Sequence, residues 1–238
     1  MEKLKSAAEK LGIFLTSYQL EMFQVYHSEL MEWNRRINLT RITDFEEVQL
    51  KHFLDSLTIA LVIKNIKKNL KIADIGTGAG LPGIPLKIVF PDIYLTLIEA
   101  TLKKAQFLEE VTSRLHLKDV EIIAERAETV AHDIKYRERF DTVVSRAVAP
   151  LPALAELMLP FCKIGGCCIV QKKGEINKEV EHSKRAIALM GGRLREVKPV
   201  EIEELSDDRW LVVIDKIESS PVNYPRRPGM PEKRPIIS

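Results

Sequence analysis

The chain has 238 residues, of which 45% are hydrophobic and 29% are charged, a composition typical of a globular protein with one main core. No apolar stretch approaches the roughly 20 residues of a membrane-spanning helix, and the charged N-terminus lacks the apolar core of a signal sequence, so we expect a cytoplasmic protein without membrane contact. The net charge of +2 neither requires nor excludes a nucleic-acid partner. The three cysteines fit neither a disulfide framework nor a zinc site, and we expect no bound metal.

Residues 1–65 are predicted to form an N-terminal helical cap. Apolar side chains recur at near-helical spacing from Leu20 to Ile37. Thr43, with Glu46 three residues later, predicts a capping box that starts a further helix. The cap is expected to pack on the domain that follows.

His52 and Asp55 lie three residues apart on that further helix. They form either a polar pair that faces a cleft or a polar pair with satisfied hydrogen bonds that holds the helix against the rest of the protein. We favour the second interpretation.

Residues 72–86 combine a buried strand, a glycine-rich turn and a helix start. Glycines let the backbone turn with positive φ and approach a ligand closely. Gly78, Gly80 and Gly83 formally fit the dinucleotide fingerprint, which binds a pyrophosphate. The stretch therefore predicts a nucleotide-like ligand, against the alternative of a plain glycine-rich turn.

Two acidic residues bear on which ligand this is. Asp74 ends the strand before the glycines, where a carboxylate would oppose a pyrophosphate but favour a ligand that carries an ammonium and a sulfonium. S-adenosylmethionine carries both. Glu99 ends the next strand about 20 residues later, in position to accept hydrogen bonds from ribose hydroxyls. NAD enzymes share this second feature, so it supports an adenosine ligand in general.

From residue 70 onward the pattern alternates between short strands and amphipathic helices, which predicts an α/β domain with a mostly parallel sheet. The last strand follows a polar segment without a clear helix, which suggests a hairpin at one edge of the sheet. We predict strands at 70–75, 94–99, 120–124, 141–145, 166–171 and 209–216.

Polar residues at the ends of the later strands are further site candidates, because ligands of open α/β sheets lie there. Ala127 and Glu128 either contact an adenine or form an ordinary loop and helix cap. Arg146 either lines the site or forms an ion pair at the edge, and we favour the site. Lys172 and Lys173 end the fifth strand at the same rim.

The end of the chain, residues 219–238, is basic and rich in proline. Arg226 and Arg227 lie in it together with a second basic pair, against one glutamate. The five prolines from 221 to 235 are expected to prevent regular structure.

Several motifs resemble one known family. They are W-N-R-R-I-N-L-T at 33–40, K-H-F-L-D-S-L at 51–57, D-I-G-T-G-A-G-L-P-G-I-P-L at 74–86, V-V-S-R-A at 143–147 and K-K-G at 172–174. Together with the proline-rich end, they resemble the bacterial small-subunit ribosomal RNA methyltransferase G family, once called glucose-inhibited division protein B. The resemblance covers essentially the whole chain.

The resemblance implies a doubly wound, seven-stranded class I (Rossmann-like) methyltransferase fold over residues 66–218, with the helical extension before it and the tail after it. It implies methyl transfer from S-adenosylmethionine to N7 of a guanine in the decoding-region loop of 16S ribosomal RNA. The partner would be 16S rRNA, the small subunit or its assembly intermediate, and the chain would be a monomer. Expected at the cofactor are Asp74, Gly76, Gly78, Gly80, Leu81, Glu99, Ala100, Thr101, Ala127, Glu128 and Arg146. Expected at the RNA are Arg35, Arg36, Asn38, Lys172, Lys173, Arg226 and Arg227.

The implied chemistry needs no general base, because guanine N7 has an in-plane lone pair and loses no proton on methylation. The chain accordingly has no Asp/Asn-Pro-Pro-aromatic element after the fourth strand, where an amine methyltransferase would carry one. No catalytic residue is assigned, and Arg146 is the best candidate in the cleft. The alternatives are a methyltransferase for another RNA or a small molecule, an NAD-dependent oxidoreductase and a non-catalytic RNA-binding module.

Overall fold

A computed structural model describes residues 1–63, 66, 68–205 and 207–237. The N-terminal region is helical, as predicted, although residue 65 at its expected boundary lies outside the described residues. A π-helical turn interrupts this region at the H-x-x-D motif, and such turns are frequent at functional sites. The helices are α1 (Glu2–Lys10), α2 (Ser17–Asn34), α3 (Phe45–Val48), the π-helix η1 (Gln49–Leu54), α4 (Asp55–Leu57) and the 3-10 helix η2 (Thr58–Leu61).

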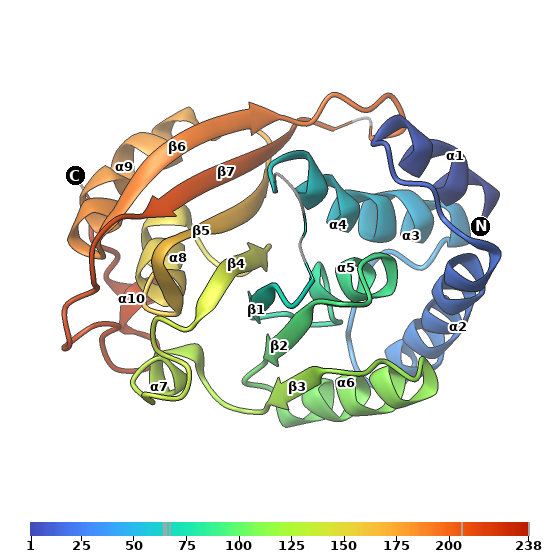
Figure 1. Ribbon diagram of the computed structural model, residues 1–238, viewed down its shortest axis with the longest axis horizontal. Coiled ribbons are helices and arrows are strands. Elements are labelled where there is room, and N and C mark those ends of the chain that lie inside the picture. Colours follow the sequence, from blue (N-terminus) through green and yellow to red (C-terminus); the bar gives the residue numbers. More distant parts are fainter. Residues whose placement is uncertain (64–65, 67, 206, 238) are drawn as a thin grey trace.

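One seven-stranded sheet forms the centre of the molecule, in the order β3-β2-β1-β4-β5-β7-β6 (Figure 1). Strands β1 to β5 are parallel where they pair, and β7 is antiparallel to both of its neighbours. The strands are β1 (Lys71–Ile75), β2 (Tyr94–Ile98), β3 (Val120–Ile123), β4 (Phe140–Arg146), β5 (Cys162–Lys173), β6 (Gly192–Pro199) and β7 (Arg209–Lys216).

Helices cover both faces of the sheet, which confirms the doubly wound fold. One face packs against the N-terminal helices, α5 and α6 in a first apolar cluster. The other packs against α8 and α9 in a second cluster, which includes two of the three unpaired cysteines. These helices are α5 (Gly83–Val89), α6 (Leu102–Arg114), α7 (Ala127–Val130), α8 (Leu151–Met158), α9 (Asn177–Leu189) and α10 (Met230–Lys233).

The sheet corrects one prediction and confirms another. All six predicted strands exist, but the structure has a seventh, β6, which we did not predict. Its residues are mostly exposed or half-buried, so its sequence is polar and resembles that of a loop. The predicted antiparallel hairpin is correct, since β6 pairs with β7. The hairpin also lies at one edge of the sheet, as predicted, with β6 as the edge strand and β7 between β5 and β6.

Two local predictions are also wrong. Asp44, and not Thr43, caps α3, because its side chain accepts hydrogen bonds from the backbone of Glu46 at 3.0 Å and of Glu47 at 2.9 Å. The proline-rich end contains regular structure, since α10 begins at Met230, with a proline in its first turn. Proline fits there because the first N–H groups of a helix have no partner within the helix. No helix in the described ranges is both long and apolar enough to span a bilayer.

Candidate functional site

The glycine loop between β1 and α5 has the backbone that the sequence predicts. Gly76, Gly78 and Gly80 all have positive φ, at 66°, 60° and 86°. A Cβ atom on Gly76 would lie 2.6 Å from the side chain of Val148, so that no larger residue fits there. Glu99 supports the loop from the neighbouring strand, since its Oε2 accepts a hydrogen bond from the backbone N–H of Gly78 at 3.0 Å.

Asp74 holds the loop from inside. Its Oδ2 accepts hydrogen bonds from the hydroxyl of Thr77 at 2.7 Å and the N–H of Gly83 at 2.8 Å. The side chain is fully buried, and burial raises its pKa to about 7. Its Oδ1 is buried and has no hydrogen-bond partner among the described residues. Asp74 therefore holds the loop and does not line the adjoining cavity, and its predicted contact with the ligand stays a prediction.

The Asp74→Asn variant is expected to have a flatter pH dependence of stability than the wild type between about pH 4 and pH 7. The native carboxyl has a raised pKa, so its stabilising contribution is complete below the unfolded value near 4 and is lost as the pH rises through about 7. The slope reaches at most about 1.4 kcal/mol per pH unit. Urea unfolding of both proteins across this range measures the difference, and parallel pH profiles would contradict the assignment.

Beside the loop lies a cavity of about 290 Å³, here called the glycine-loop cavity. Both oxygens of Glu99 accept backbone hydrogen bonds, the second from Thr101 at 2.8 Å. An ionised carboxylate has about four acceptor positions, so two remain for hydroxyl groups. This arrangement fits a ribose. The predicted cofactor residues that line the cavity are Gly76, Glu99, Ala100, Thr101, Ala127 and Glu128.

Other predicted cofactor residues do not line this cavity. Gly78 and Gly80 shape the loop, and Leu81 is buried in the apolar core. Arg146 lines a second cavity, described next. The cofactor contacts that we predicted for Gly78, Gly80, Leu81 and Arg146 stay predictions.

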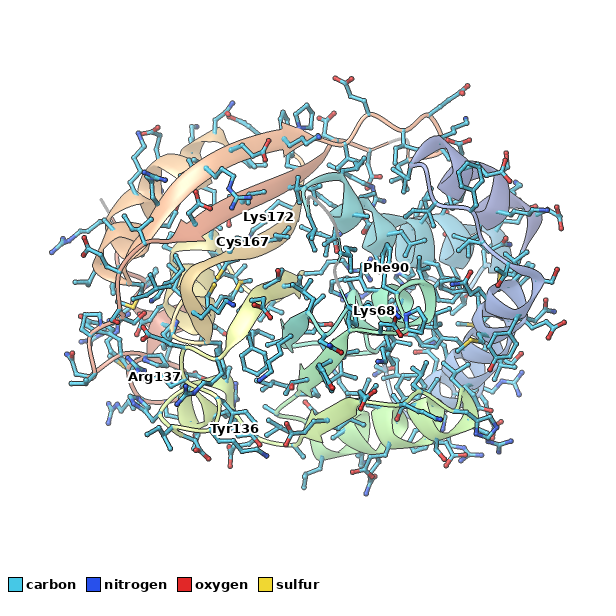
Figure 2. The ribbon with its side chains drawn as sticks, viewed as in Figure 1. Lys68, Phe90, Tyr136, Arg137, Cys167 and Lys172 are labelled. Carbon is cyan, nitrogen blue, oxygen red and sulfur yellow. The ribbon has the colours of Figure 1, made fainter. Side chains whose placement is uncertain are left out.

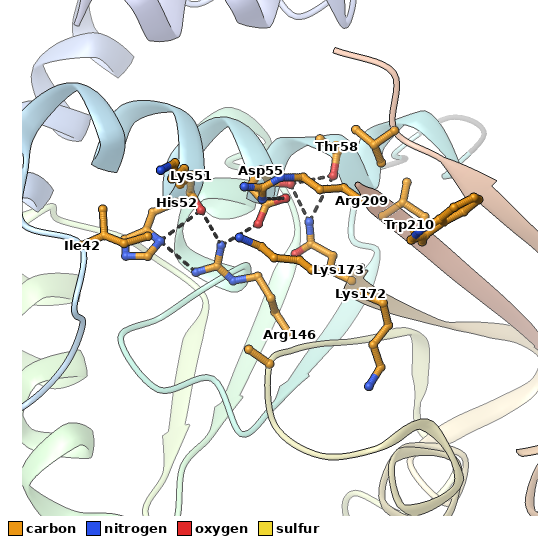
Figure 3. Close-up of a pocket in the computed structure, with 14 residues that line it drawn as sticks. Ile42, Lys51, His52, Asp55, Thr58, Arg146, Lys172, Lys173, Arg209 and Trp210 are labelled. Atoms are coloured by element: carbon orange, nitrogen blue, oxygen red, sulfur yellow. Dashed lines mark hydrogen bonds and ion pairs between the residues drawn. The ribbon is translucent and has the colours of Figure 1, made fainter. Parts of the chain in front are cut away.

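The second cavity, of about 280 Å³, is here called the basic cavity (Figure 3). Ala147 lines both cavities, and its φ of 56° is left-handed, a strained conformation for a non-glycine residue that is common at functional sites. The two cavities therefore meet at the carboxyl end of β4. The basic cavity is lined by Ile42, Lys51, His52, Asp55, Thr58, Arg146, Ala147, Gln171, Lys172, Lys173, Val200, Arg209, Trp210 and Leu211.

A buried charge network forms the floor of the basic cavity. Asp55 makes ion pairs with Arg146, at 2.8 Å, and with Arg209, at 2.6 Å. Arg146 also donates to the carbonyl of Lys51 at 3.0 Å and lies 3.2 Å from Nδ1 of His52 (Figure 3). Burial and the Arg146 charge lower the pKa of His52 to about 4, so the ring is neutral at pH 7. His52 and Asp55 thus connect the helical region to the sheet through Arg146 and Arg209, as favoured from the sequence, and both also line a cavity, as the other interpretation predicted. Arg146 likewise both forms an ion pair and lines a cavity.

The predicted RNA residues lie in three places. Arg35, Arg36 and Asn38 are exposed just after α2, and Arg36 pairs with a glutamate of the same helix at 2.8 Å. Lys172 and Lys173 line the basic cavity, Lys172 nearly buried against Glu179. The structure thus brings the lysines, but not the tail, to the basic cavity.

The tail arginines differ from each other. Arg227 is exposed. Arg226 instead makes two-pronged contacts with the buried Glu156, the shorter ones at 2.7 and 2.9 Å. Its guanidinium therefore has a structural partner that the sequence did not reveal.

Among the site residues that sequence reasoning missed are Tyr26, Trp210 and Arg209. The buried Tyr26 of α2 donates from its hydroxyl to the carbonyl of Ala79 in the glycine loop. Trp210 and Arg209 line the basic cavity from β7. The only signal for Tyr26 was a polar hydroxyl on the apolar side of a helix, which does not identify its partner.

Comparisons with known proteins agree with this geometry. The profile of the family described as rRNA small subunit methyltransferase G matches residues 19–207. A Dehalococcoides mccartyi protein named ribosomal RNA small subunit methyltransferase G is 51% identical over 237 residues and covers 100% of both chains. A protein of the same name from Thermoanaerobacter sp. is 46% identical and covers 99% of this chain and 98% of its own length.

Solved structures with the same arrangement share little sequence with the chain. A variant of MtNAS in complex with S-adenosylmethionine has a TM-score of 0.56 and 17% identity, over 90% of this chain and 77% of that chain. An S-adenosylmethionine-dependent methyltransferase from Aquifex aeolicus has a TM-score of 0.52 and 18% identity, over 73% of this chain and 94% of its own. At these identities, the similarity shows a common fold.

Proposed function

Because the chain belongs to the rRNA small subunit methyltransferase G family, we propose that it transfers a methyl group from S-adenosylmethionine to N7 of a guanine in the decoding-region loop of 16S rRNA. The observation that carries this proposal is the meeting of two cavities at Ala147. One has the polar groups that an adenosine needs, and the other has a basic rim suited to a nucleotide.

The glycine-loop cavity is the proposed cofactor site. Glu99 would accept hydrogen bonds from the ribose through its free acceptor positions, and Ala127 with Glu128 would flank the adenine. Gly76 would let the backbone approach the ligand. Asp74 would hold the loop in shape. S-adenosylmethionine, when bound, supplies the electrophilic methyl group.

The basic cavity is the proposed site for the target base. Trp210 offers an aromatic ring there and Lys173 a half-exposed ammonium group, and bases stack on such rings. Guanine N7 attacks with its own lone pair, so no side chain has to remove a proton. The contribution of the protein is then to orient the base and exclude water, which can lower a barrier by about 7 to 11 kcal/mol.

The exposed basic residues after α2 are the proposed RNA contacts outside the cavities. The Arg35→Ala/Arg36→Ala variant is expected to weaken binding to 16S rRNA and to reduce the salt slope by about 1.4, since each phosphate contact on a single strand contributes about 0.7. Filter binding at increasing KCl measures the slope. Lys135→Ala/Arg139→Ala removes two exposed charges at the amino ends of the strands and serves as the control. Equal slopes for both variants would exclude a contact at 35–36.

We propose further that residues 1–65 act as a cap, 66–218 as the methyltransferase domain and 219–238 as the basic C-terminal tail. The proposed partner is 16S rRNA, free or in an assembling small subunit. We propose that the protein binds it as a monomer in the cytoplasm.

Incubation of the purified protein with isotope-labelled S-adenosylmethionine and small-subunit particles tests the function. Mass spectrometry of nuclease fragments should find the label on N7 of one guanine in the decoding-region loop. Label on another position, or none with both free rRNA and particles, would refute the proposed reaction.

A further inference from the structure

The C-terminal segment 221–237, here called the C-terminal strap, returns to the glycine-loop cavity, which its Glu232 lines. Glu156 on α8 is completely buried, and within the described ranges it accepts hydrogen bonds only from Arg226. The backbone N–H of Arg226 contributes one of them, at 2.7 Å. A buried carboxylate is stable only when it is paired, so the core of the protein requires the strap to be docked.

Two residues just after α7 hold the start of the strap. Arg137 donates to the carbonyls of Pro221, at 2.9 Å, and Tyr224, at 2.8 Å. His132 lies 2.8 Å from the carbonyl of Pro225. Figure 2 shows Arg137 near α7, on the side of the molecule where the C-terminal segment lies. Since α7 begins at Ala127, which lines the glycine-loop cavity, the strap is attached next to that cavity.

The strap also reaches the cavity itself. The backbone N–H of Gly229 donates to Oε1 of Glu128 at 2.7 Å, and Glu128 is buried. Gly229 has a φ of 79°, which orients this N–H and favours glycine. Glu232, at the beginning of α10, lines the cavity together with Glu128.

We propose that the C-terminal strap is part of the cofactor-binding site: it forms one side of the glycine-loop cavity and holds the carboxylate of Glu128 in its binding orientation. This inference rests on the proposed function, which makes the cavity the site of S-adenosylmethionine. By linkage, docking of the strap and binding of the cofactor strengthen each other. The strap is then a determinant of cofactor affinity, in addition to any contact that it makes with RNA.

Titration calorimetry of the full-length Gly229→Val variant with S-adenosylmethionine tests the inference. A β-branched residue at this φ distorts the strap, and loss of one charge-assisted hydrogen bond corresponds to about a tenfold weaker affinity. Gly165→Val is the matched control, because Gly165 has a φ of 83°, open space around its Cβ and a place on β5 near the amino end of β4. Its affinity should equal that of the wild type.

Hydrogen exchange of the wild type gives a second readout that does not depend on a variant. Bound S-adenosylmethionine should slow exchange of the Gly229 amide severalfold. Wild-type affinity in Gly229→Val, or unchanged exchange at Gly229 in a protein that binds the cofactor, overturns the inference and leaves the proposed function intact. A wild-type protein that does not bind S-adenosylmethionine overturns both.

Discussion

The Gly78→Val variant is expected to lose cofactor binding, with affinity at least about 100-fold weaker, while it keeps the fold. Gly78 has a φ of 60°, where a β-branched residue is strongly disfavoured. Its N–H donates to Glu99, so relaxation of the strain would also displace the carboxylate that we assign to the ribose. A Cβ at this position meets no atom closer than the carbonyl oxygen of Gly76, at 4.0 Å. The new side chain would therefore extend into open space beside the loop without disrupting the core.

Calorimetry with S-adenosylmethionine and thermal unfolding, carried out together, check this result. Gly12→Val provides the control for backbone strain, because Gly12 has a φ of 74° and open space around its Cβ but lies before α2. The control should bind the cofactor normally and lose similar stability. Normal binding by Gly78→Val would remove the glycine loop from the cofactor site.

The Asp55→Ala variant is expected to be the most destabilised of the proposed variants, by about 3–5 kcal/mol. Asp55 is the shared partner of Arg146 and Arg209, and all three side chains are largely buried, with exposed fractions of 5%, 13% and 2%. Its removal leaves two guanidinium groups in a poorly solvated site with one partly exposed carboxylate, that of Asp207, beside Arg209. The contacts that join α4 to β4 and β7 would be lost.

Urea unfolding measures this loss. Glu32→Ala is the comparison, because it breaks an exposed ion pair with Arg36, and such pairs contribute at most about 1 kcal/mol. If the free energies of unfolding of Asp55→Ala and Glu32→Ala differ by less than about 1 kcal/mol, the Asp55 pairs contribute no more than exposed ion pairs do. The network would then not hold the helical region to the sheet. Loss of stability should also be accompanied by loss of RNA methylation, since Arg146 lines the basic cavity.

Most of the fold could be predicted from the sequence, and the exception has a physical reason. Buried parallel strands are apolar runs, so β1, β2 and β4 stand out from their surroundings. Strand β6 lies at an edge and is mostly exposed, and its sequence therefore resembles a loop. The position of β7 inside the sheet depends on pairing with that unrecognised strand.

The candidate site was predictable where its residues directly follow parallel strands. Three of its parts follow successive strands, namely the glycines, Glu99 and the 127–128 pair. The carboxyl ends of parallel strands lie on the same side of the sheet. These residues line one cavity because the strands that they follow are parallel. The alternation of strands and helices in the sequence already predicts that parallel arrangement. The basic cavity was only partly predictable, because Trp210 reaches it from an antiparallel strand.

The sequence alone determined the sheet class, the glycine turn and, through family resemblance, the reaction, because these depend on local patterns of burial, backbone freedom and short motifs. The tertiary structure alone decided which charges are paired. Arg146 meets Asp55 across 91 positions and Arg226 meets Glu156 across 70. The sequence around such a charged side chain does not identify its partner, because these ion pairs form and are buried only when distant segments pack together. For this reason the arginine predicted to face RNA, Arg226, anchors the C-terminal strap.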